Sequence, residues 1–263
     1  NCTILTNRLI MQELSDKDLK RLVEIGKDNA KYNTEEMLNE LSNNFEKYNK
    51  DDNIEENGFQ KLVKYLDKTN PEVKDSDLFS FFGPMQYPFR KSIKELLEKA
   101  KSRREEEPRY TYHLGIYTKD DPTYLIGMLI ITSKIYETKT GSRTGYFGYI
   151  LDRNFQGRGF ATEVQKAIFG LFCNYIIPKS EGFNKNTKIY ATSHPLNARL
   201  HKIQHKFDVE VADEFVHKVY KSKRTAFYFD IEKVKKIVNT EDNKWIAVIN
   251  NKVYMSDYLK INE

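Results

Sequence analysis

The chain of 263 residues is long enough for one large domain with a sizeable core, or for a core domain with additions. Hydrophobic residues make up 39% of it and aromatic residues 13%, which excludes a fully disordered protein. The 43 basic and 38 acidic residues give a net charge of +5, but both signs alternate in short runs along the sequence. This mixing is typical of a solvated surface, so nucleic-acid binding is the minor interpretation.

The two cysteines, Cys2 and Cys173, lie far apart in the sequence, so neither a disulfide framework nor a metal site is indicated. Such sparse cysteine usage fits a reducing compartment, and we expect a cytoplasmic protein. No apolar run approaches the length of a membrane span, and the first residues, NCTILTNRLIMQEL, lack the pattern of a signal peptide. We therefore expect no membrane partner, while a targeting segment removed from this sequence stays an open alternative.

The first part of the chain is predicted to hold one strand and several helices. Apolar and polar residues alternate partly over 3–14, which predicts a strand, and the spacing of the next apolar residues predicts a helix over 17–29. The following stretch is rich in Asn, Lys, Asp and Glu, yet its apolar residues recur at helical spacing. We therefore expect a helical insertion at about 30–87 and a further helix over 92–104.

Strand signals dominate the middle of the chain. Three β-like stretches separated by short polar turns predict an antiparallel meander: 109–118, 123–136 and 143–151. A helical run over 158–177 and a buried strand over 187–193 then predict a βαβ crossover in a mixed sheet. The remaining predicted elements are a helix started by Pro195, two strands within 208–231, a short helix, and a hairpin that turns at Asn250-Asn251.

The stretch LDRNFQGRGFATE over 151–163 carries the first functional signal. It places Gly157 and Gly159 on either side of Arg158, after a predicted strand and before a predicted helix. Glycines there can simply serve a tight strand-to-helix turn. They can also let an anion approach the N–H groups at the helix start, with Arg153 and Arg158 adding charge-assisted contacts. The motif alone leaves both interpretations open.

Further segments give this motif a context. They are TNRLIMQELSDKDLKRL near the start, YLIGMLIIT in the meander, GYFGYILDRNFQGRGFATEVQKAIFGLFCNYI, and IYATSHPLNARLHKIQHKFDVE. In this order they resemble the GNAT superfamily of acyl-CoA-dependent N-acyltransferases, in particular the branch of the ribosomal-protein N-terminal acetyltransferases. The resemblance implies an α+β fold with a mixed, splayed central sheet flanked by helices. It gives an acyltransferase domain over 1–231, and residues 232–263 are expected to form an extension packed on it.

The resemblance also implies acetyl-CoA as the cofactor. The strand end at Tyr149 to Leu151 would present backbone groups to the pantetheine arm, the N–H groups of Gly157 to Ala161 would hold the pyrophosphate, and Asn197 would contact the pantetheine or thiol end. The cofactor-binding residues expected on these grounds are Tyr149, Ile150, Leu151, Arg153, Gln156, Gly157, Arg158, Gly159, Phe160, Ala161 and Asn197.

The family reaction is direct attack of a primary amine on the acetyl thioester, so neither cysteine is required as a nucleophile. The acceptor would be a protein N-terminus, a lysine or a small-molecule amine. The proton chemistry is less well marked, because the family often has Glu where this chain has Tyr146 and a tyrosine acid where it has Gln204. A tyrosine with a pKa near 10 is a poor base at neutral pH.

His194 is the best local candidate for a base, because it ends a predicted strand and titrates near neutral pH. A role in capping the helix that follows is the structural alternative. Ser193 and Tyr146 are candidates for binding substrate or water. His201 and His205 have a spacing that a metal can use, but no third ligand is near them in the sequence, so we expect no metal. A non-catalytic acyl-CoA sensor or interaction module remains the alternative function.

Overall fold

The computed structural model describes residues 1–26, 28–29, 90–193, 197–216 and 223–262. Within them one mixed sheet has the strand order β11-β10-β1-β2-β3-β4-β6-β7-β9-β8, and β5 pairs with β6 beside this path. The strands are β1 Cys2–Leu5, β2 Leu9–Glu13, β3 Thr111–Thr118, β4 Leu125–Thr132, β5 Ile135–Thr138, β6 Gly141–Leu151, β7 Lys188–Ser193, β8 Glu210–Val216, β9 Lys223–Asp230, β10 Ile246–Ile249 and β11 Lys252–Met255.

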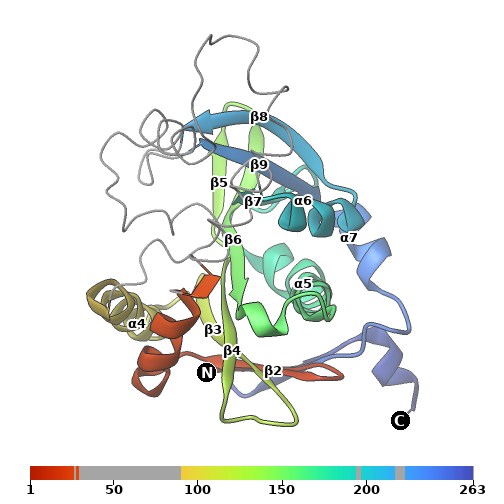
Figure 1. Ribbon diagram of the computed structural model, residues 1–263. Helices are drawn as coiled ribbons and strands as arrows, with labels where there is room; N and C mark the ends of the chain where they lie inside the picture. Colours follow the sequence, from red (N-terminus) through yellow and green to blue (C-terminus); the bar gives the residue numbers. More distant parts are fainter. Residues whose placement is uncertain (27, 30–89, 194–196, 217–222, 263) are drawn as a thin grey trace, which may run out of the picture.

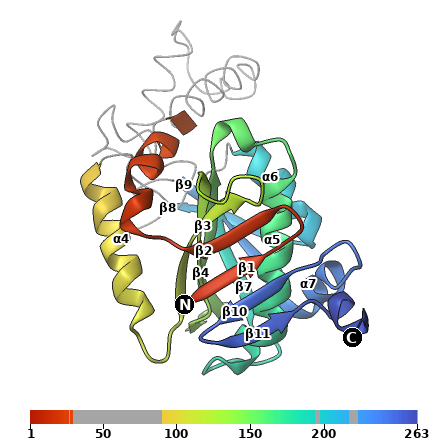
Figure 2. The same ribbon diagram turned by 90° about the horizontal axis from the view of Figure 1, so that it is seen from below.

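Helices cover both faces of this sheet (Figures 1 and 2). The helices α5 (Phe160–Leu171) and α7 (Ile231–Val238) bury their apolar side chains in the larger core cluster on one face. The N-terminal helix, described over residues 19–26 and 28–29, and α4 (Arg90–Arg104) pack on the other face, where Leu22 and Leu97 meet Tyr117 of β3. The predicted α+β class, with a mixed sheet flanked by helices, is confirmed.

The prediction of one strand over 3–14 is wrong, because this stretch forms a hairpin of β1 and β2. The chain reverses between Thr6 and Leu9, where the Thr6 N–H donates to the Leu9 carbonyl over 3.0 Å. The Thr6 hydroxyl in turn accepts from the Leu9 N–H over 3.0 Å. Buried and less buried residues alternate within each strand, but the buried positions change from even-numbered in β1 to odd-numbered in β2, and this change of phase marks the turn.

The helix predicted over 17–29 is present from residue 19, and a short 3₁₀ turn, Asp16–Asp18, leads into it. The Ser15 N–H donates to the Asp18 carboxylate over 2.8 Å, and this carboxylate also accepts from the Tyr117 hydroxyl over 2.8 Å. The helix start is thereby fixed to β3. The helix predicted over 92–104 is confirmed by α4. The insertion predicted at about 30–87 lies outside the described residues.

The antiparallel meander is confirmed by the pairing of β3 with β4 and of β4 with β6. The stretch predicted as one strand over 123–136 is divided, since β4 ends at Thr132 and β5 begins at Ile135 to form a hairpin with the start of β6. The crossover is confirmed as well, because β6 and β7 are parallel and α5 connects them. The helical run continues beyond α5 as a π-helical turn, Phe172–Ile176.

The C-terminal hairpin of β10 and β11 is confirmed, and it extends the central sheet by pairing with β1. Its turn residues Asn250 and Asn251 have φ values of 48° and 64°, the left-handed conformation that such a two-residue turn requires. In Figure 2 this hairpin lies at the sheet edge beside β1. None of the helices in the described ranges is both long and apolar enough to cross a lipid bilayer.

Trp245, just before β10, fixes the C-terminal segment to α5. Its side chain is buried, and its ring meets the Tyr175 ring edge-on at 6.1 Å between centroids. A Cβ atom added at Gly170 would lie 2.6 Å from the indole nitrogen, so α5 has no side chain where the indole packs. The C-terminal hairpin therefore depends on an aromatic contact with the helix that connects β6 and β7.

We expect Trp245→Ala to lower the free energy of unfolding by about 3–5 kcal/mol, because it removes a large buried ring and leaves a cavity against α5. Denaturant unfolding followed by circular dichroism measures this change. The matched control is Tyr258→Ala, an aromatic of the same segment that is 37% exposed, and it should change the free energy by less than about 0.5 kcal/mol. Equal losses in both variants would contradict the role assigned to Trp245.

Candidate functional site

The central sheet opens between β6 and β7. Their parallel pairing ends at Phe147 and Ala191, although β6 continues to Leu151 and β7 to Ser193. Beyond this point β6 stays paired with β4 and β7 stays paired with β9. The two strands therefore diverge while each is held from its other side, and the predicted splay of the sheet is present.

The register shows which backbone groups of β6 face this opening. The Asp152 N–H donates to the Ile126 carbonyl over 2.7 Å, and alternate residues of an antiparallel ladder make such bonds. The main chain of Ile150 therefore faces β4, whereas Tyr149 and Leu151 direct their N–H and carbonyl groups toward the opening. Of the three residues expected to contact a pantetheine arm, Ile150 offers only its side chain.

The glycine motif forms a turn into α5 that leaves its backbone exposed. Gly157 and Gly159 have φ values of 75° and 81°, which side-chain-bearing residues rarely adopt, so the turn requires both glycines. The first helical bond comes from the Glu163 N–H to the Gly159 carbonyl over 3.0 Å, so the N–H groups of Phe160 to Thr162 precede the helical bonding pattern. The helix dipole adds positive potential at the same place. The two interpretations of the motif are therefore compatible: the glycines allow the tight turn, and the turn leaves N–H groups at the helix start that could hold an anion.

A cavity of about 740 Å³ extends from this turn into the strand opening. Nine of the predicted cofactor residues line it: Tyr149, Ile150, Leu151, Arg153, Gln156, Gly157, Gly159, Ala161 and Asn197. Two predicted residues do not. Phe160 is buried in the core, and the Arg158 guanidinium lies over the Phe155 ring at 5.3 Å.

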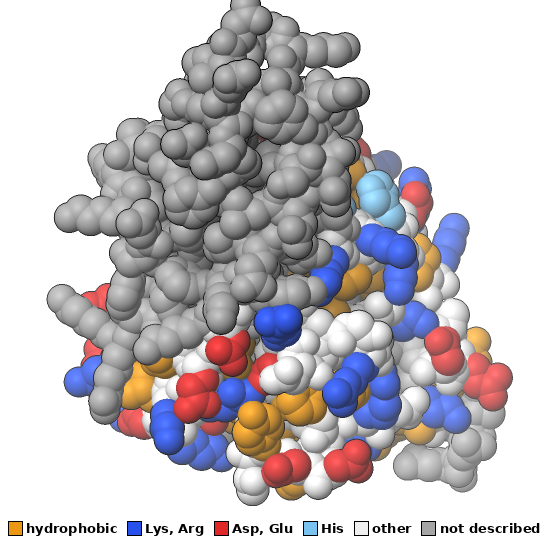
Figure 3. Space-filling view, viewed as in Figure 1, with side chains coloured by type: hydrophobic (Ala, Val, Ile, Leu, Met, Phe, Trp, Pro, Cys, Tyr) orange, Lys and Arg blue, Asp and Glu red, His pale blue; other side chains and the backbone are white. Residues whose placement is uncertain are grey.

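The charge of the cavity wall is one-sided. Four cationic side chains line it, Arg153, Arg199, Lys202 and Lys206, and no Asp or Glu is among its described lining residues. Three of the four come from the helix α6 (Ala198–Gln204) and the 3₁₀ turn that follows it. Figure 3 shows Lys and Arg side chains over α6 and the start of α5. Sequence analysis did not assign Arg199 or Lys202 to the site, since a basic residue on a helix is usually just solvated.

Asn29 is a further lining residue that sequence analysis missed. Its amide nitrogen donates to the Leu151 carbonyl over 2.8 Å, and the amide nitrogen of Gln156 donates to the same carbonyl over 2.9 Å. Gln156 also donates to Asn29 Oδ1 over 2.7 Å, and its own oxygen accepts from Arg199 over 3.2 Å. The carbonyl at the end of β6 is therefore held by two side chains and is not available to a ligand.

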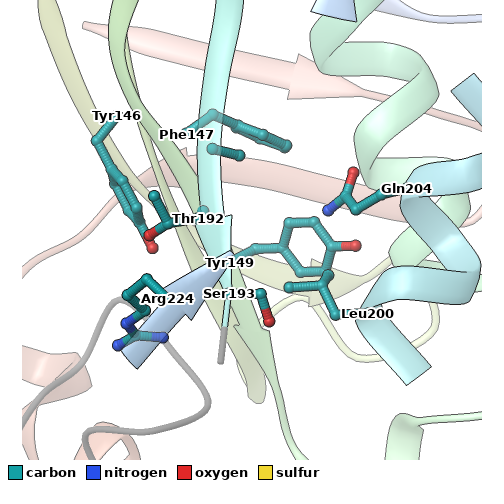
Figure 4. Close-up of a pocket in the computed structure, with 10 residues that line it drawn as sticks. Tyr146, Phe147, Tyr149, Thr192, Ser193, Leu200, Gln204 and Arg224 are labelled. Atoms are coloured by element: carbon teal, nitrogen blue, oxygen red, sulfur yellow. The ribbon is translucent and has the colours of Figure 1, made fainter. Parts of the chain in front are cut away.

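A second, narrow cavity of about 10 Å³ lies deeper between β6 and β7. Figure 4 shows its wall, which includes the predicted residues Tyr146 and Ser193 together with Gln204 and the buried Arg224. The Tyr146 ring packs over Gly148, where an added Cβ would lie 2.3 Å from its hydroxyl. His194, the predicted base, lies outside the described residues, so only Tyr146 and Ser193 of that set can be placed together. The helix after it begins at Ala198, and Asn197 caps it by accepting from the Leu200 N–H over 3.1 Å.

The two cysteines are fully buried. Burial raises the pKa of the Cys2 thiol to about 12 and raises the pKa of the Cys173 thiol as well, so neither forms a thiolate at neutral pH. The His201 ring meets the Phe227 ring edge-on at 5.0 Å between centroids. The part of the chain that the structure describes contains no group of three potential metal ligands.

No family model and no curated protein matches the chain. Solved structures that are similar to it include RimL, a ribosomal L7/L12 alpha-N-protein acetyltransferase in complex with coenzyme A. The two chains are 11% identical, the match covers 84% of this chain and 93% of that chain, and the TM-score is 0.47. A GNAT-family acetyltransferase from Bacillus anthracis is 11% identical over 88% of this chain and 99% of its own, with a TM-score of 0.49. An acetyl transferase from Salmonella typhimurium that modifies the N-terminal serine of L7/L12 is 11% identical over 86% and 96%, with a TM-score of 0.48. At this identity, the chemistry of the site has to be read from the residues of this chain.

Asn29→Ala should lower the free energy of unfolding by about 1–3 kcal/mol, because it removes one of the two donors to the Leu151 carbonyl and the bond that the Gln156 amide makes to Asn29. The control is Asn154→Ala, whose side chain is exposed and which should change the free energy by less than about 0.5 kcal/mol. Urea denaturation of both variants measures the difference. If Asn29→Ala were as stable as the control, the link between the N-terminal helix and the end of β6 would be of no energetic importance.

Proposed function

We propose that the protein is an acetyl-CoA-dependent N-acetyltransferase of the GNAT type that acts on a primary amine. The observation that carries this proposal is the cavity of about 740 Å³ whose described wall has four cations and no acid, and which joins the start of α5 to the opening between β6 and β7. A ligand that suits it has an anionic end and an extended arm that reaches between two strands.

Coenzyme A has these two parts. The N–H groups from Gly157 to Thr162 would hold the pyrophosphate, since they precede the bonded part of α5 and lie at its positive end. Arg199, Lys202 and Lys206 would neutralise the remaining phosphate charge. The outward-facing backbone of Tyr149 would bond the amide groups of the arm in the manner of a neighbouring strand. Asn197 uses its side-chain oxygen as the cap of α6, so its amide nitrogen is the group left for the ligand.

When bound, acetyl-CoA supplies an acetyl group that is activated as a thioester. The amine nitrogen forms a bond to the acetyl carbon, the carbon–sulfur bond breaks with its electron pair going to sulfur, and the nitrogen loses one proton. This chain contributes by holding both reactants in place and by polarising the carbonyl group. Tyr146 of β6 and Ser193 of β7 are proposed to hold the acceptor amine or a water molecule that takes the proton. His194 is retained as the proposed base on sequence grounds.

The competing function is a sensor that binds acyl-CoA without turnover. Tyr146 and Gln204, which stand where the GNAT pattern has titratable acid–base groups, favour this alternative. The two functions are separated by incubating the protein with acetyl-CoA and a panel of amines, namely N-terminal peptides, lysine peptides, polyamines and aminoglycosides. An N-acetyltransferase releases free thiol in proportion to acetylated amine, whereas a sensor binds acetyl-CoA and releases none. Failure to bind acetyl-CoA in calorimetry would exclude both functions.

We expect Lys202→Glu to weaken acetyl-CoA binding by about tenfold or more at low salt, because it places a negative charge in the wall that faces the phosphates. Raising the salt concentration should shrink the difference between the variant and the wild-type protein, since screening weakens charge interactions. Isothermal calorimetry at two salt concentrations measures both effects. The matched control is Lys244→Glu, an exposed lysine outside the cavity with the same change in net charge, and its affinity should stay within about twofold of wild type.

A further inference from the structure

A chain of three neutral side chains connects the strand opening to the two helices beside it. The Tyr149 hydroxyl of β6 donates to Gln165 Oε1 of α5 over 3.3 Å, and Gln165 Nε2 donates to Gln204 Oε1 of α6 over 2.7 Å. Gln165 is 0% exposed and Gln204 is 2% exposed. Polar side chains buried to this extent are held where their hydrogen bonds place them.

In the structure this network of three side chains orients the Gln204 amide. Its oxygen is engaged by Gln165, so its nitrogen must point away from α5. In Figure 4 that nitrogen points toward the other residues of the narrow cavity. Gln204 Nε2 donates to no group within the described residues, although an amide nitrogen carries two hydrogens. The fold thus presents a neutral hydrogen-bond donor in a fixed orientation at the inner end of the strand opening.

The size of the cavity limits what this donor can bind. Its volume of about 10 Å³ is roughly what one water molecule requires, so it can take one oxygen atom but not an acetyl group. Tyr149 and Leu200 line both cavities. The end of a pantetheine arm that passes along Tyr149 in the larger cavity would therefore reach the narrow cavity. Arg224, whose side chain is buried at the same wall, adds positive charge there. An oxygen that carries partial negative charge suits these surroundings.

We propose that Gln204 Nε2 donates a hydrogen bond to the carbonyl oxygen of the acetyl thioester, and that Gln165 is the positioning residue that holds it in this orientation. The inference rests on the proposed function. A carbonyl oxygen is a good hydrogen-bond acceptor, whereas a thioether or thioester sulfur is a weak one. The bond polarises the carbonyl group and strengthens as negative charge develops on its oxygen during attack by the amine. An amide does not give up its proton, so this donor acts without taking part in proton transfer.

The test compares the affinities of the full-length protein for acetyl-CoA and for S-ethyl-CoA, a thioether of similar size that lacks the carbonyl oxygen, by calorimetry. We expect the wild-type protein to bind acetyl-CoA about tenfold more tightly, which corresponds to one well-placed hydrogen bond. Gln204→Met, which keeps the side-chain length and removes the donor, should reduce this preference to about twofold or less and leave the affinity for S-ethyl-CoA unchanged.

Gln165→Met should also reduce the preference, although Gln204 itself is intact, because the amide is no longer held with its nitrogen toward the cavity. If Gln165 had a merely structural role, the substitution would instead weaken the binding of both ligands equally. The matched control is Gln12→Met on β2, which lies outside both cavities and should keep the tenfold preference. Thermal unfolding confirms that each variant is folded before its ratio is used.

Equal affinity of the wild-type protein for the two ligands, or an undiminished preference in a folded Gln204→Met or Gln165→Met variant, would overturn the inference and leave the proposed function standing. If neither ligand bound to the wild-type protein, the proposed function would be overturned together with this inference. A preference that falls in both variants and persists in Gln12→Met supports the assignment.

Discussion

The site depends on the early end of the pairing between β6 and β7. Two adjacent strands of a sheet normally satisfy each other's backbone groups along their whole shared length. Here they separate after Phe147 and Ala191, while the pairing of Gly127 with Leu151 and of Ser193 with Thr225 holds each strand from its outer side. The opening is therefore built into the sheet and does not require a strand to move when a ligand enters. Both cavities lie along this opening, and Tyr149 of β6 lines both of them.

The exposed backbone groups are handled in two different ways along β6. At the strand end, Asn29 and Gln156 satisfy the Leu151 carbonyl from within the protein. Earlier in the same strand, the N–H and carbonyl groups of Tyr149 face the cavity. An extended ligand could form hydrogen bonds with them as a neighbouring strand would. The two cavities also differ in character: lysines and arginines line the larger one, while one side-chain amide, several hydroxyls and one buried arginine line the narrow one. This asymmetry determines which way a ligand with one anionic end can lie.

Local sequence patterns were sufficient for the features that depend on a few neighbouring residues. The two glycines around Arg158 predicted the turn into α5, and Asn250-Asn251 predicted the hairpin turn, because left-handed backbone conformations restrict the residues that can adopt them. The order of strand and helix signals likewise predicted the mixed sheet and its crossover. The hairpin over 3–14 was missed because its turn is short, so the change in phase of the buried positions between Ile4 and Leu9 was its only local mark.

Residues that act through long-range contacts could not be found in this way. Asn29 lies 122 positions from the carbonyl that it binds, and Gln165 lies 39 positions from Gln204. Nothing in the neighbourhood of either residue distinguishes it from an ordinary polar residue on a helix. Arg224 was equally inconspicuous in a strand of mixed composition. Their positions follow only from the folded arrangement, which brings Asn29 to the end of β6 and brings Gln165 of α5 against Gln204 of α6.

The neutral character of the buried chain has a consequence for how the site would respond to pH. Burial raises the pKa of Tyr149, and amides do not titrate, so all three members of the chain stay uncharged throughout the neutral range. The Gln204 donor therefore has the same strength at pH 6 as at pH 9, unlike a donor supplied by an imidazolium or a carboxylic acid. For the proposed acetyl transfer, a change of rate with pH would then have to arise outside this side-chain network, in the acceptor amine or in the group that takes its proton. Orientation of the carbonyl would thereby be separated from proton transfer, so that substitutions could alter the two independently.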